Sequence, residues 1–302
     1  MKMHPDELEI DVALVRRLVA AQFPDWAELP LEPVFPRGTD NRLFRLGAEL
    51  VVRLPCREGT VKTLEKERDW LPWLAPHLPL DVPVPLAVGS PADGYPWTWS
   101  VYTWLEGESA ISSPLEDPDA AATDLAAFIK ALEGIDVPAT RAPAKGTSRG
   151  APVAGLDASV RESIAGLGRE IEVARVTAVW EAALEASVWE QPPVWVHGDL
   201  DARNLLVRRG RIAAVVDFGC LGIGDPACDV AVAWKLFPPE ARGRFREALS
   251  IDDATWARAR GWIVYQSLGA LAYYTLETNP SLFSEAQRWL RELLPTGPRR
   301  CA

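Results

Sequence analysis

Residues 195 to 219 read WVHGDLDARNLLVRRGRIAAVVDFG and contain two short apolar runs separated by a charged turn. The runs LLV, at 205–207, and IAAVVDF, at 212–218, have the length of β-strands. Gly210 lies between them in RRGR, and glycine suits a turn residue with positive φ. The pattern therefore predicts a β-hairpin, which fixes the side chains that meet at its open end.

Three oxygen-bearing side chains surround this predicted hairpin. Asn204 lies just before the first strand and Asp217 near the end of the second, so antiparallel pairing places both at the same end. Two hard oxygen ligands suit Mg²⁺, which completes its octahedron with water and substrate phosphates. Asp199, on the loop that leads into the hairpin, is then free to accept the proton of an attacking hydroxyl. We therefore predict a magnesium pair with a separate general base.

The motifs HGDLDARN and VVDFG resemble the catalytic signature of the aminoglycoside phosphotransferase family, which shares its fold with protein kinases. The interval from Asp199 to Asn204 matches the Asp-x4-Asn of the kinase catalytic loop, and Asp217 begins the metal-binding Asp-Phe-Gly. The later segment GDPACDVAVAW is similar to the family's next motif, which implies that Asp229 braces the catalytic loop. The resemblance covers essentially the whole chain. It implies that Asp199 is the catalytic base and that Asn204 and Asp217 hold Mg²⁺.

The polar neighbours of these residues have simpler interpretations. His197 is expected to be a packed, hydrogen-bonded anchor of the loop rather than a catalyst, and Asp229 a structural residue at a helix start. For Asp201 and Asp225 the sequence assigns no role, since solvation alone would account for their carboxylates.

The resemblance implies an α+β, protein-kinase-like fold with two lobes. Residues 1–104 would form a small β-rich nucleotide-binding lobe that ends in the interlobe linker. Residues 105–302 would form a larger, mainly helical lobe with the catalytic loop and the acceptor site.

Local patterns divide the chain in the same way. The pattern of the first third predicts strands, including the runs LFRLG and ELVVRLP, around one helix. This helix lies near 60–78 and includes Pro72, and an extended segment follows at 81–89. Asp117 and Pro118 predict a helix start, and Gly134 its end. We further expect helices at about 157–187, 240–249, 253–277 and 281–294, and a long loop at 137–155.

On the nucleotide side, the family's phosphate-binding lysine corresponds to Arg53 in LVVRLP, which is a departure that keeps the positive charge. Its expected partner is Glu67 in the following helix. Glu65 is the alternative, two residues away and therefore on a different helix face.

Two further segments are expected to contact ATP or GTP. Gly38 and Thr39 begin a turn whose backbone N–H groups could cover phosphates, although no Walker A sequence is present. Tyr102, Thr103 and Trp104 lie at the end of the strand WTWSVYTW, and their backbone is expected to hydrogen-bond the purine edge.

Composition excludes several other classes of protein. The net charge of −10 argues against nucleic-acid binding, which needs clustered Lys and Arg. The four cysteines and three histidines show no spacing typical of a zinc site. The cysteines are scattered and are expected to be reduced thiols. Neither a membrane-spanning apolar run nor a secretory signal is evident, so we expect a cytoplasmic protein without a membrane partner. The oligomeric state is left open.

The expected activity is transfer of the γ-phosphoryl group of ATP or GTP to a hydroxyl of a small, antibiotic-like acceptor. A metabolite kinase for choline, a sugar or an amino-alcohol is the alternative, followed by a catalytically silent nucleotide-binding protein. Trp262, Tyr265, Leu271, Tyr273 and Tyr274 lie on the helix expected near the acceptor. Aromatic residues at helical spacing are more often core, but two of them facing the acceptor would favour a bulky, apolar or planar acceptor over a polycation.

Overall fold

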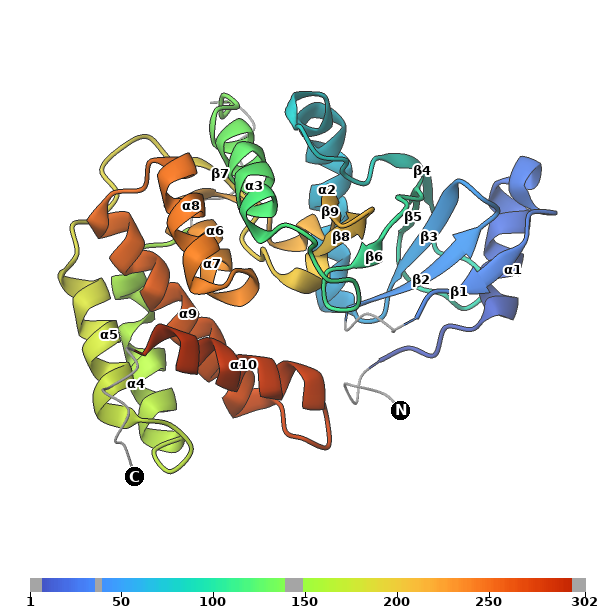
Figure 1. Ribbon diagram of the computed structural model, residues 1–302. Coiled ribbons are helices and arrows are strands. Elements are labelled where there is room, and N and C mark those ends of the chain that lie inside the picture. Colours follow the sequence, from blue (N-terminus) through green and yellow to red (C-terminus); the bar gives the residue numbers. More distant parts are fainter. Residues whose placement is uncertain (1–6, 36–39, 139–148, 295–302) are drawn as a thin grey trace. The chain divides into compact units, whose positions relative to one another are not determined.

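The computed structural model describes residues 7–35, 40–138 and 149–294. The chain forms two compact units (Figure 1). The first unit comprises Met1–Glu108 and Ala213–Gly219, and the second comprises Ser109–Ile212 and Cys220–Ala302. This division differs from the predicted one, because the first unit extends beyond residue 104 and also includes the separate segment 213–219.

The first unit is built on a five-stranded antiparallel sheet in the order β1-β2-β3-β5-β4. Its strands are β1 (Leu31–Pro33), β2 (Asn41–Leu46), β3 (Leu50–Pro55), β4 (Pro85–Gly89) and β5 (Trp99–Thr103). The predicted hairpin of β2 and β3 is confirmed. It turns at Gly47, whose φ of 62° is accessible to glycine without strain.

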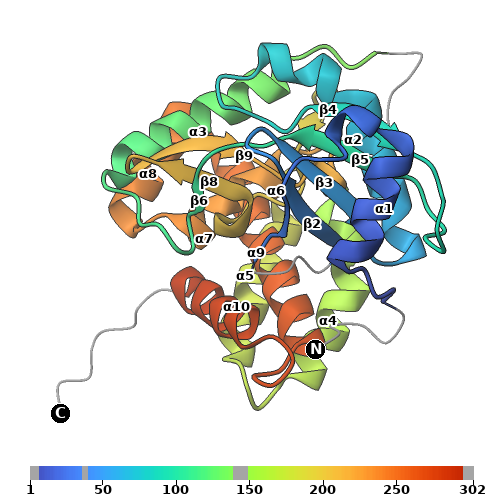
Figure 2. The same cartoon turned by 90° about the vertical axis from the view of Figure 1, so that its right-hand side faces the viewer.

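Helices cover both faces of this sheet, namely α1 (Val12–Gln22) and α2 (Val61–Leu74). Val52 and Leu54 of β3 are fully buried in a core that also contains residues of α1, which lies against the sheet in Figure 2. Arg53 lies between them in the strand, so it points to the opposite face and reaches α2. Strand alternation thus directs one charged side chain away from the main core and toward α2.

The expectation of a single helix in this part of the chain is wrong, because α1 precedes the strands. Its signals are local: Asp11 caps the helix by accepting from the Leu14 N–H, and Val15, Leu18 and Val19 are buried at helical spacing. The predicted second helix is confirmed as α2, with Pro72 in its last turn. Short 3₁₀ segments occur at Pro24–Trp26, Glu58–Thr60 and Ala75–His77.

The second unit is mainly helical. Its helices are α3 (Pro118–Glu133), α4 (Asp157–Gly166), α5 (Val173–Glu185), α6 (Ala227–Val230), α7 (Val232–Leu236), α8 (Pro239–Leu249), α9 (Asp253–Tyr273) and α10 (Pro280–Leu293), with 3₁₀ segments at Val153–Leu156, Ala202–Asn204 and Phe218–Cys220. The long helix α9 lies at the centre, and α4, α5, α6 and α10 each contact it (Figure 1).

Short strands complete the architecture. They are β6 (Glu108–Ser109), β7 (Val194–Val196), β8 (Leu205–Arg208), β9 (Arg211–Val215) and β10 (Gly222–Gly224). β7 pairs with β10, and the other three form a sheet in the order β6-β8-β9. The predicted hairpin of β8 and β9 is confirmed, with positive φ at Arg209 and Gly210 in its turn.

Most predicted helices of the second unit are confirmed, and two need correction. The start of α3 is as predicted, since the Asp117 carboxylate accepts two N–H groups of the first turn. The single helix expected at 157–187 is wrong: the chain turns after Gly166 and resumes as α5 at Val173, so the region forms two helices. The helix expected to reach residue 277 ends at Tyr273, before a turn in which the Thr275 N–H donates to the Thr278 hydroxyl.

Every helix in the described parts of the chain is too short or too polar to traverse a lipid bilayer. Cys56, Cys220 and Cys228 are free thiols, as predicted, and Cys301 lies outside the described residues.

Candidate active site

The first unit holds a buried ion pair between β3 and α2. The Arg53 Nη1 lies 2.6 Å from the Glu67 Oε2, and the Tyr102 hydroxyl donates to the same oxygen at 3.0 Å. Glu67 is 0% exposed, since it shares the buried face of α2 with Leu64 and Leu71. Burial raises the pKa of Glu67, and the adjacent Arg53 charge opposes that rise. Glu67, rather than Glu65, is thus the partner of Arg53.

Asp217 joins this pair through the other guanidinium nitrogen. The Arg53 Nη2 donates to the Asp217 Oδ1 at 3.0 Å, while 51% of the Asp217 side chain is exposed. Asn41 supplies a third acceptor when its amide oxygen faces Arg53, at 3.0 Å from Nη2 and 3.2 Å from Nε. One guanidinium therefore holds three oxygen-bearing side chains, a geometry that a single lysine ammonium cannot reproduce.

Asp217 adopts φ of 63°, an unusual conformation for a residue other than glycine. Two hydrogen bonds fasten the strand before it: the Asp81 N–H donates to the Ala213 carbonyl and the Val215 N–H donates to the Asp81 carbonyl. The Lys66 ammonium donates to the Gly219 carbonyl at 3.1 Å. The metal-binding candidate is thus presented in a strained conformation that its surroundings hold in place.

The second unit holds the loop that carries Asp199. The Asp229 carboxylate accepts the N–H groups of His197 and Gly198, each at 2.7 Å. His197 is fully buried, and its Nδ1 accepts the Asp199 N–H at 3.2 Å. Gly198 has φ of 81°, and a Cβ there would lie 2.6 Å from the Cys220 carbonyl oxygen. His197 and Asp229 therefore have the structural roles that the sequence suggested.

The Asp199 carboxylate is 38% exposed and lies 3.5 Å from the Arg149 Nη2. Burial by itself would raise the pKa of Asp199, but the positive charges of Arg149 and Lys235 hold that pKa below its usual range. The carboxylate is therefore ionised at neutral pH and able to accept a proton. The buried Lys235 also holds the loop that contains Asp199, because its ammonium donates to the Leu200 carbonyl at 3.1 Å.

Asn204 lies in the same loop and contacts the base segment directly. Its Nδ2 donates to the Asp199 carbonyl at 2.8 Å, which leaves the Oδ1 as the atom available to a cation. Asp201 starts this turn by accepting the Arg203 N–H at 2.9 Å. The described residues contain no group of three or more His, Cys, Asp or Glu side chains suited to a metal. The Asn204 amide oxygen is a hard donor of the kind that Mg²⁺ accepts, and Mg²⁺ takes most of its other ligands from water and phosphate.

Several supporting residues were not assigned a role from the sequence. Asp201 forms ion pairs with Arg203 and lies 3.8 Å from Lys235, and Arg203 also pairs with Glu285 of α10. Asp225, also undecided, forms a two-pronged pair with Arg258. Apart from Asp201–Arg203, these pairs join residues that are far apart in the chain, so the sequence alone does not reveal them.

The purine contact stays a prediction, and it would rely on backbone carbonyl oxygens rather than on the N–H groups of Thr103 and Trp104. The Thr103 N–H donates to the Val84 carbonyl at 3.2 Å, and the Trp104 N–H to the Glu49 carbonyl at 2.7 Å. Both donors are therefore used within the first unit. Tyr102 lies inside β5, opposite Val51, and contributes its hydroxyl to Glu67 instead. Gly38 and Thr39 lie outside the described residues.

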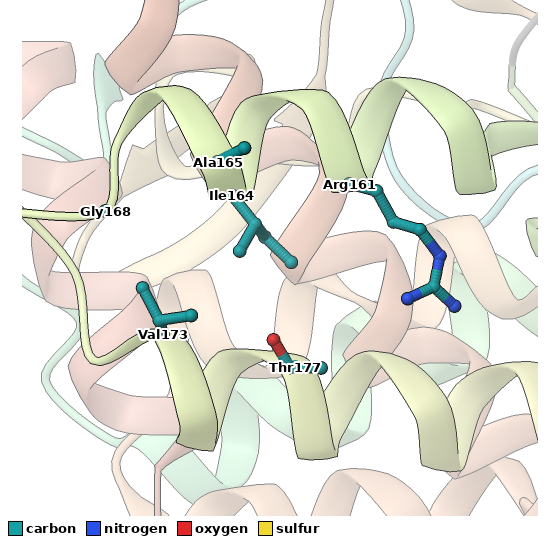
Figure 3. A pocket seen from close by; sticks show the side chains of 6 residues that line it. All are labelled: Arg161, Ile164, Ala165, Gly168, Val173 and Thr177. Atoms are coloured by element: carbon teal, nitrogen blue, oxygen red, sulfur yellow. The ribbon is translucent and has the colours of Figure 1, made fainter.

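The helix α9 contributes its aromatic residues mainly to packing. Trp262 is 0% exposed and Leu271 is buried, so both belong to the core, whereas Tyr265 and Tyr274 are half-buried and Tyr273 is exposed. A separate hollow between α4 and α5 has a volume of about 450 Å³ (Figure 3). It is lined by Arg161, Ile164, Ala165, Gly168, Val173 and Thr177, none of which is a predicted site residue.

A sequence model of the phosphotransferase enzyme family matches residues 33–262. The chain belongs to the phosphotransferase enzyme family. The matched range includes every predicted site residue of this phosphotransferase, from Gly38 to Asp217. An aminoglycoside 3′-phosphotransferase of Escherichia coli is 30% identical over 190 residues, which are 61% of this chain and 68% of that protein.

Solved structures show that this phosphotransferase has the α+β, kinase-like fold predicted from its sequence. The GDP complex of wild-type aminoglycoside 2′-phosphotransferase-IIIa has a TM-score of 0.70 at 18% identity, over 94% of this chain and 98% of the other. A macrolide 2′-phosphotransferase of Brachybacterium faecium has a TM-score of 0.62 at 22% identity, over 96% and 99% of the two chains.

Proposed function

We propose that this enzyme transfers the γ-phosphoryl group of ATP or GTP to a hydroxyl of a small, antibiotic-like acceptor in a Mg²⁺-dependent reaction. The observation that carries the proposal is the Asp199 loop: a partly exposed, ionised carboxylate on a backbone fixed by Asp229 and His197. A general base must be accessible and held in one orientation, and Asp199 meets both requirements.

In the proposed reaction, Asp199 accepts the proton of the acceptor hydroxyl as its oxygen attacks the γ-phosphorus. A new bond forms between that oxygen and phosphorus, and the bond between phosphorus and the β,γ-bridging oxygen breaks, which leaves a nucleoside diphosphate. Asn204 and Asp217 would hold Mg²⁺, which neutralises phosphate charge when bound. Arg53, aligned by Glu67, would contact phosphate oxygens. The GDP complex of one similar enzyme supports a guanine nucleotide as donor, and the streptomycin-ATP complex of another supports an adenine nucleotide.

The charges near the catalytic loop support an acceptor that is not a polycation. Asp201 and Glu285 are already paired with Arg203, so their carboxylates are neutralised within the protein. Arg149 adds positive charge beside Asp199. We therefore propose a bulky acceptor with apolar or planar surface, as a macrolide has, over a kanamycin-like aminoglycoside.

A transfer assay with both ATP and GTP tests this proposal. The acceptors are erythromycin, kanamycin, a nucleoside antibiotic, choline and simple sugars, and product mass is the readout. We expect a phosphorylated macrolide or similar product, with a higher kcat/KM than for kanamycin. Efficient, salt-sensitive transfer to kanamycin alone would contradict the acceptor class, and transfer to choline or a sugar alone would identify a metabolite kinase.

The base is tested by substitution. Asp199→Ala is expected to lower kcat by at least about a hundredfold, because a positioned base contributes about 10²–10⁴ in rate. Nucleotide binding, measured by calorimetry, should survive. Near-normal turnover of this variant would exclude Asp199 as the base, and absence of both nucleotide hydrolysis and transfer by the unmodified enzyme would leave a silent nucleotide-binding protein.

A further inference from the structure

Arg149 is attached to the catalytic loop by its backbone as well as by its side chain. It precedes Gly150, whose φ is 74° and whose carbonyl accepts the Asp225 N–H at 2.9 Å. A Cβ on Gly224 would lie 2.0 Å from the Gly150 carbonyl oxygen, so the two backbones are in direct contact. The turn at Arg149 therefore has little freedom to move away from the segment that follows the Asp-Phe-Gly motif.

The Arg149 stem also requires a glycine in the catalytic loop. A Cβ on Gly198 would lie 2.9 Å from the Arg149 Cβ, closer than side chains approach. The Gly198 position thus admits Arg149 to the space beside Asp199. From there the Nη2 reaches the Asp199 Oδ1 at 3.5 Å, with 23% of the Arg149 side chain exposed.

The burial of the Arg149 guanidinium lowers the stability of the folded state. The Arg149 Nη1 is buried and has no hydrogen-bond partner among the described residues. A buried guanidinium with an unsatisfied donor typically costs more free energy than an apolar side chain of similar size. A residue selected only for packing would not bring a charge to this position, so its contact with Asp199 is the feature that accounts for it.

We propose that Arg149 is a positioning residue, which holds the Asp199 carboxylate in the orientation that accepts the acceptor proton. This inference rests on the proposed function. Arg149 acts through Asp199, because its Nη1 is enclosed by protein and its Nη2 faces the Asp199 Oδ1.

The test compares Arg149→Met, Arg149→Lys and the control Arg161→Met, with GTP and ATP as donors and erythromycin and kanamycin as acceptors. Arg161 lies in α4 and pairs with Asp157 and Glu181, away from the residues assigned to catalysis. We expect Arg149→Met to lower kcat about 10- to 100-fold, as misplacement of a catalytic group does. KM for donor and acceptor should change less than about twofold, Arg149→Lys should regain part of kcat, and Arg161→Met should leave kcat unchanged.

A double-mutant cycle with Asp199→Asn separates positioning from structure. In the Asp199→Asn background, Arg149→Met should cause little further loss of kcat, and the two losses of melting temperature should not add. Additive losses, or normal kcat in Arg149→Met, would overturn the inference while leaving the proposed function in place. No transfer by the unmodified enzyme would overturn both, and the cycle in melting temperature would still show whether the Arg149–Asp199 contact exists in solution.

Discussion

Arg53 contacts Glu67, Asp217 and Asn41 at once, so at the residue scale one guanidinium holds three oxygen-bearing side chains. The Arg53 guanidinium uses Nη1 for Glu67 and Nη2 for Asp217. The same guanidinium also makes the site more rigid, because any movement of Asp217 changes a contact of Arg53. If Arg53 stands at the predicted phosphate-binding position, it supplies the positive charge there and in addition fixes the neighbouring side chains.

Replacing Arg53 separates these effects. Arg53→Ala is expected to raise the nucleotide KM and to lower kcat, with a combined loss in kcat/KM of about a hundredfold or more, because it leaves Glu67 buried without a cation. Arg53→Lys should retain part of the activity. Steady-state kinetics with varied nucleotide measure both. Unchanged nucleotide kinetics in Arg53→Ala would indicate another cation, with the exposed Lys62 as the next candidate.

Glu133, at the end of α3, should make stability depend on pH. Burial, with a smaller contribution from the Asp229 charge, raises the pKa of Glu133 from 4.5 to about 7. Between these values the folded state binds more protons than the unfolded state, so the free energy of unfolding falls as pH rises. Glu133→Gln should therefore be more stable than the original enzyme at pH 8, by about 1–3 kcal/mol, and similar to it below the ordinary glutamate pKa.

Urea unfolding at pH 4.5 and pH 8 measures this difference for Glu133. The matched control is Glu162→Gln in α4, where the side chain is exposed and little change is expected. An equal effect of Glu133→Gln at both pH values would show that the carboxyl does not titrate in this range.

At the scale of elements, the contact of α5 with α9 depends on Gly261. A Cβ on Gly261 would lie 2.6 Å from the Ala183 Cβ and 3.4 Å from the Trp180 ring. Gly261→Ala should therefore destabilise the fold by about 1–3 kcal/mol through overpacking, although alanine favours helices. Gly269 lies in the same helix with open space around it, so Gly269→Ala should be neutral or stabilising by up to about 1 kcal/mol. Denaturant unfolding of both variants checks the pair, and equal stabilities would refute the close helix contact.

Elements with local signals were predictable from the sequence. The cap at Asp117, the turn glycine Gly210 and the Asp-x4-Asn spacing each depend on neighbouring residues, and all three appear in the structure. The break between α4 and α5 was missed, although Gly166 and Gly168 mark it, because helical spacing continues on both sides.

Other features depend on contacts between distant residues, which one sequence does not reveal. The Thr103 and Trp104 N–H groups pair with Val84 and Glu49, so the strand end looked open only when it was considered alone. Arg149 lies in a segment predicted as a loop, and its approach to Asp199 requires the glycine at 198. The motif residues and the supports that belong to its pattern, such as His197 and Asp229, were thus predictable, whereas Arg149 was not.

At the scale of the whole molecule, the proposed dependence on Mg²⁺ through Asn204 and Asp217 can be tested directly. Removal of Mg²⁺ with a chelator should abolish transfer, and Asn204→Ala should lower kcat by about a hundredfold or more. At position 217, Asp217→Asn is the better test than alanine, because asparagine tolerates the positive φ while it removes the charge. Transfer in excess chelator, or Mg²⁺ dependence unchanged in both variants, would contradict the assignment.

The first unit is built from two separate segments of the chain, and this has a consequence during protein synthesis. Its sheet lies within the first 108 residues, yet its Asp217 arrives on a segment that the ribosome makes after roughly a hundred further residues. The strand β9 is held there by bonds to Asp81, which are formed only once that segment has emerged. In a nascent chain, Arg53 and Glu67 are therefore made early and Asp217, which pairs with Arg53, is made late. Chains interrupted in between would lack the strand β9 and the Asp217 contact to Arg53.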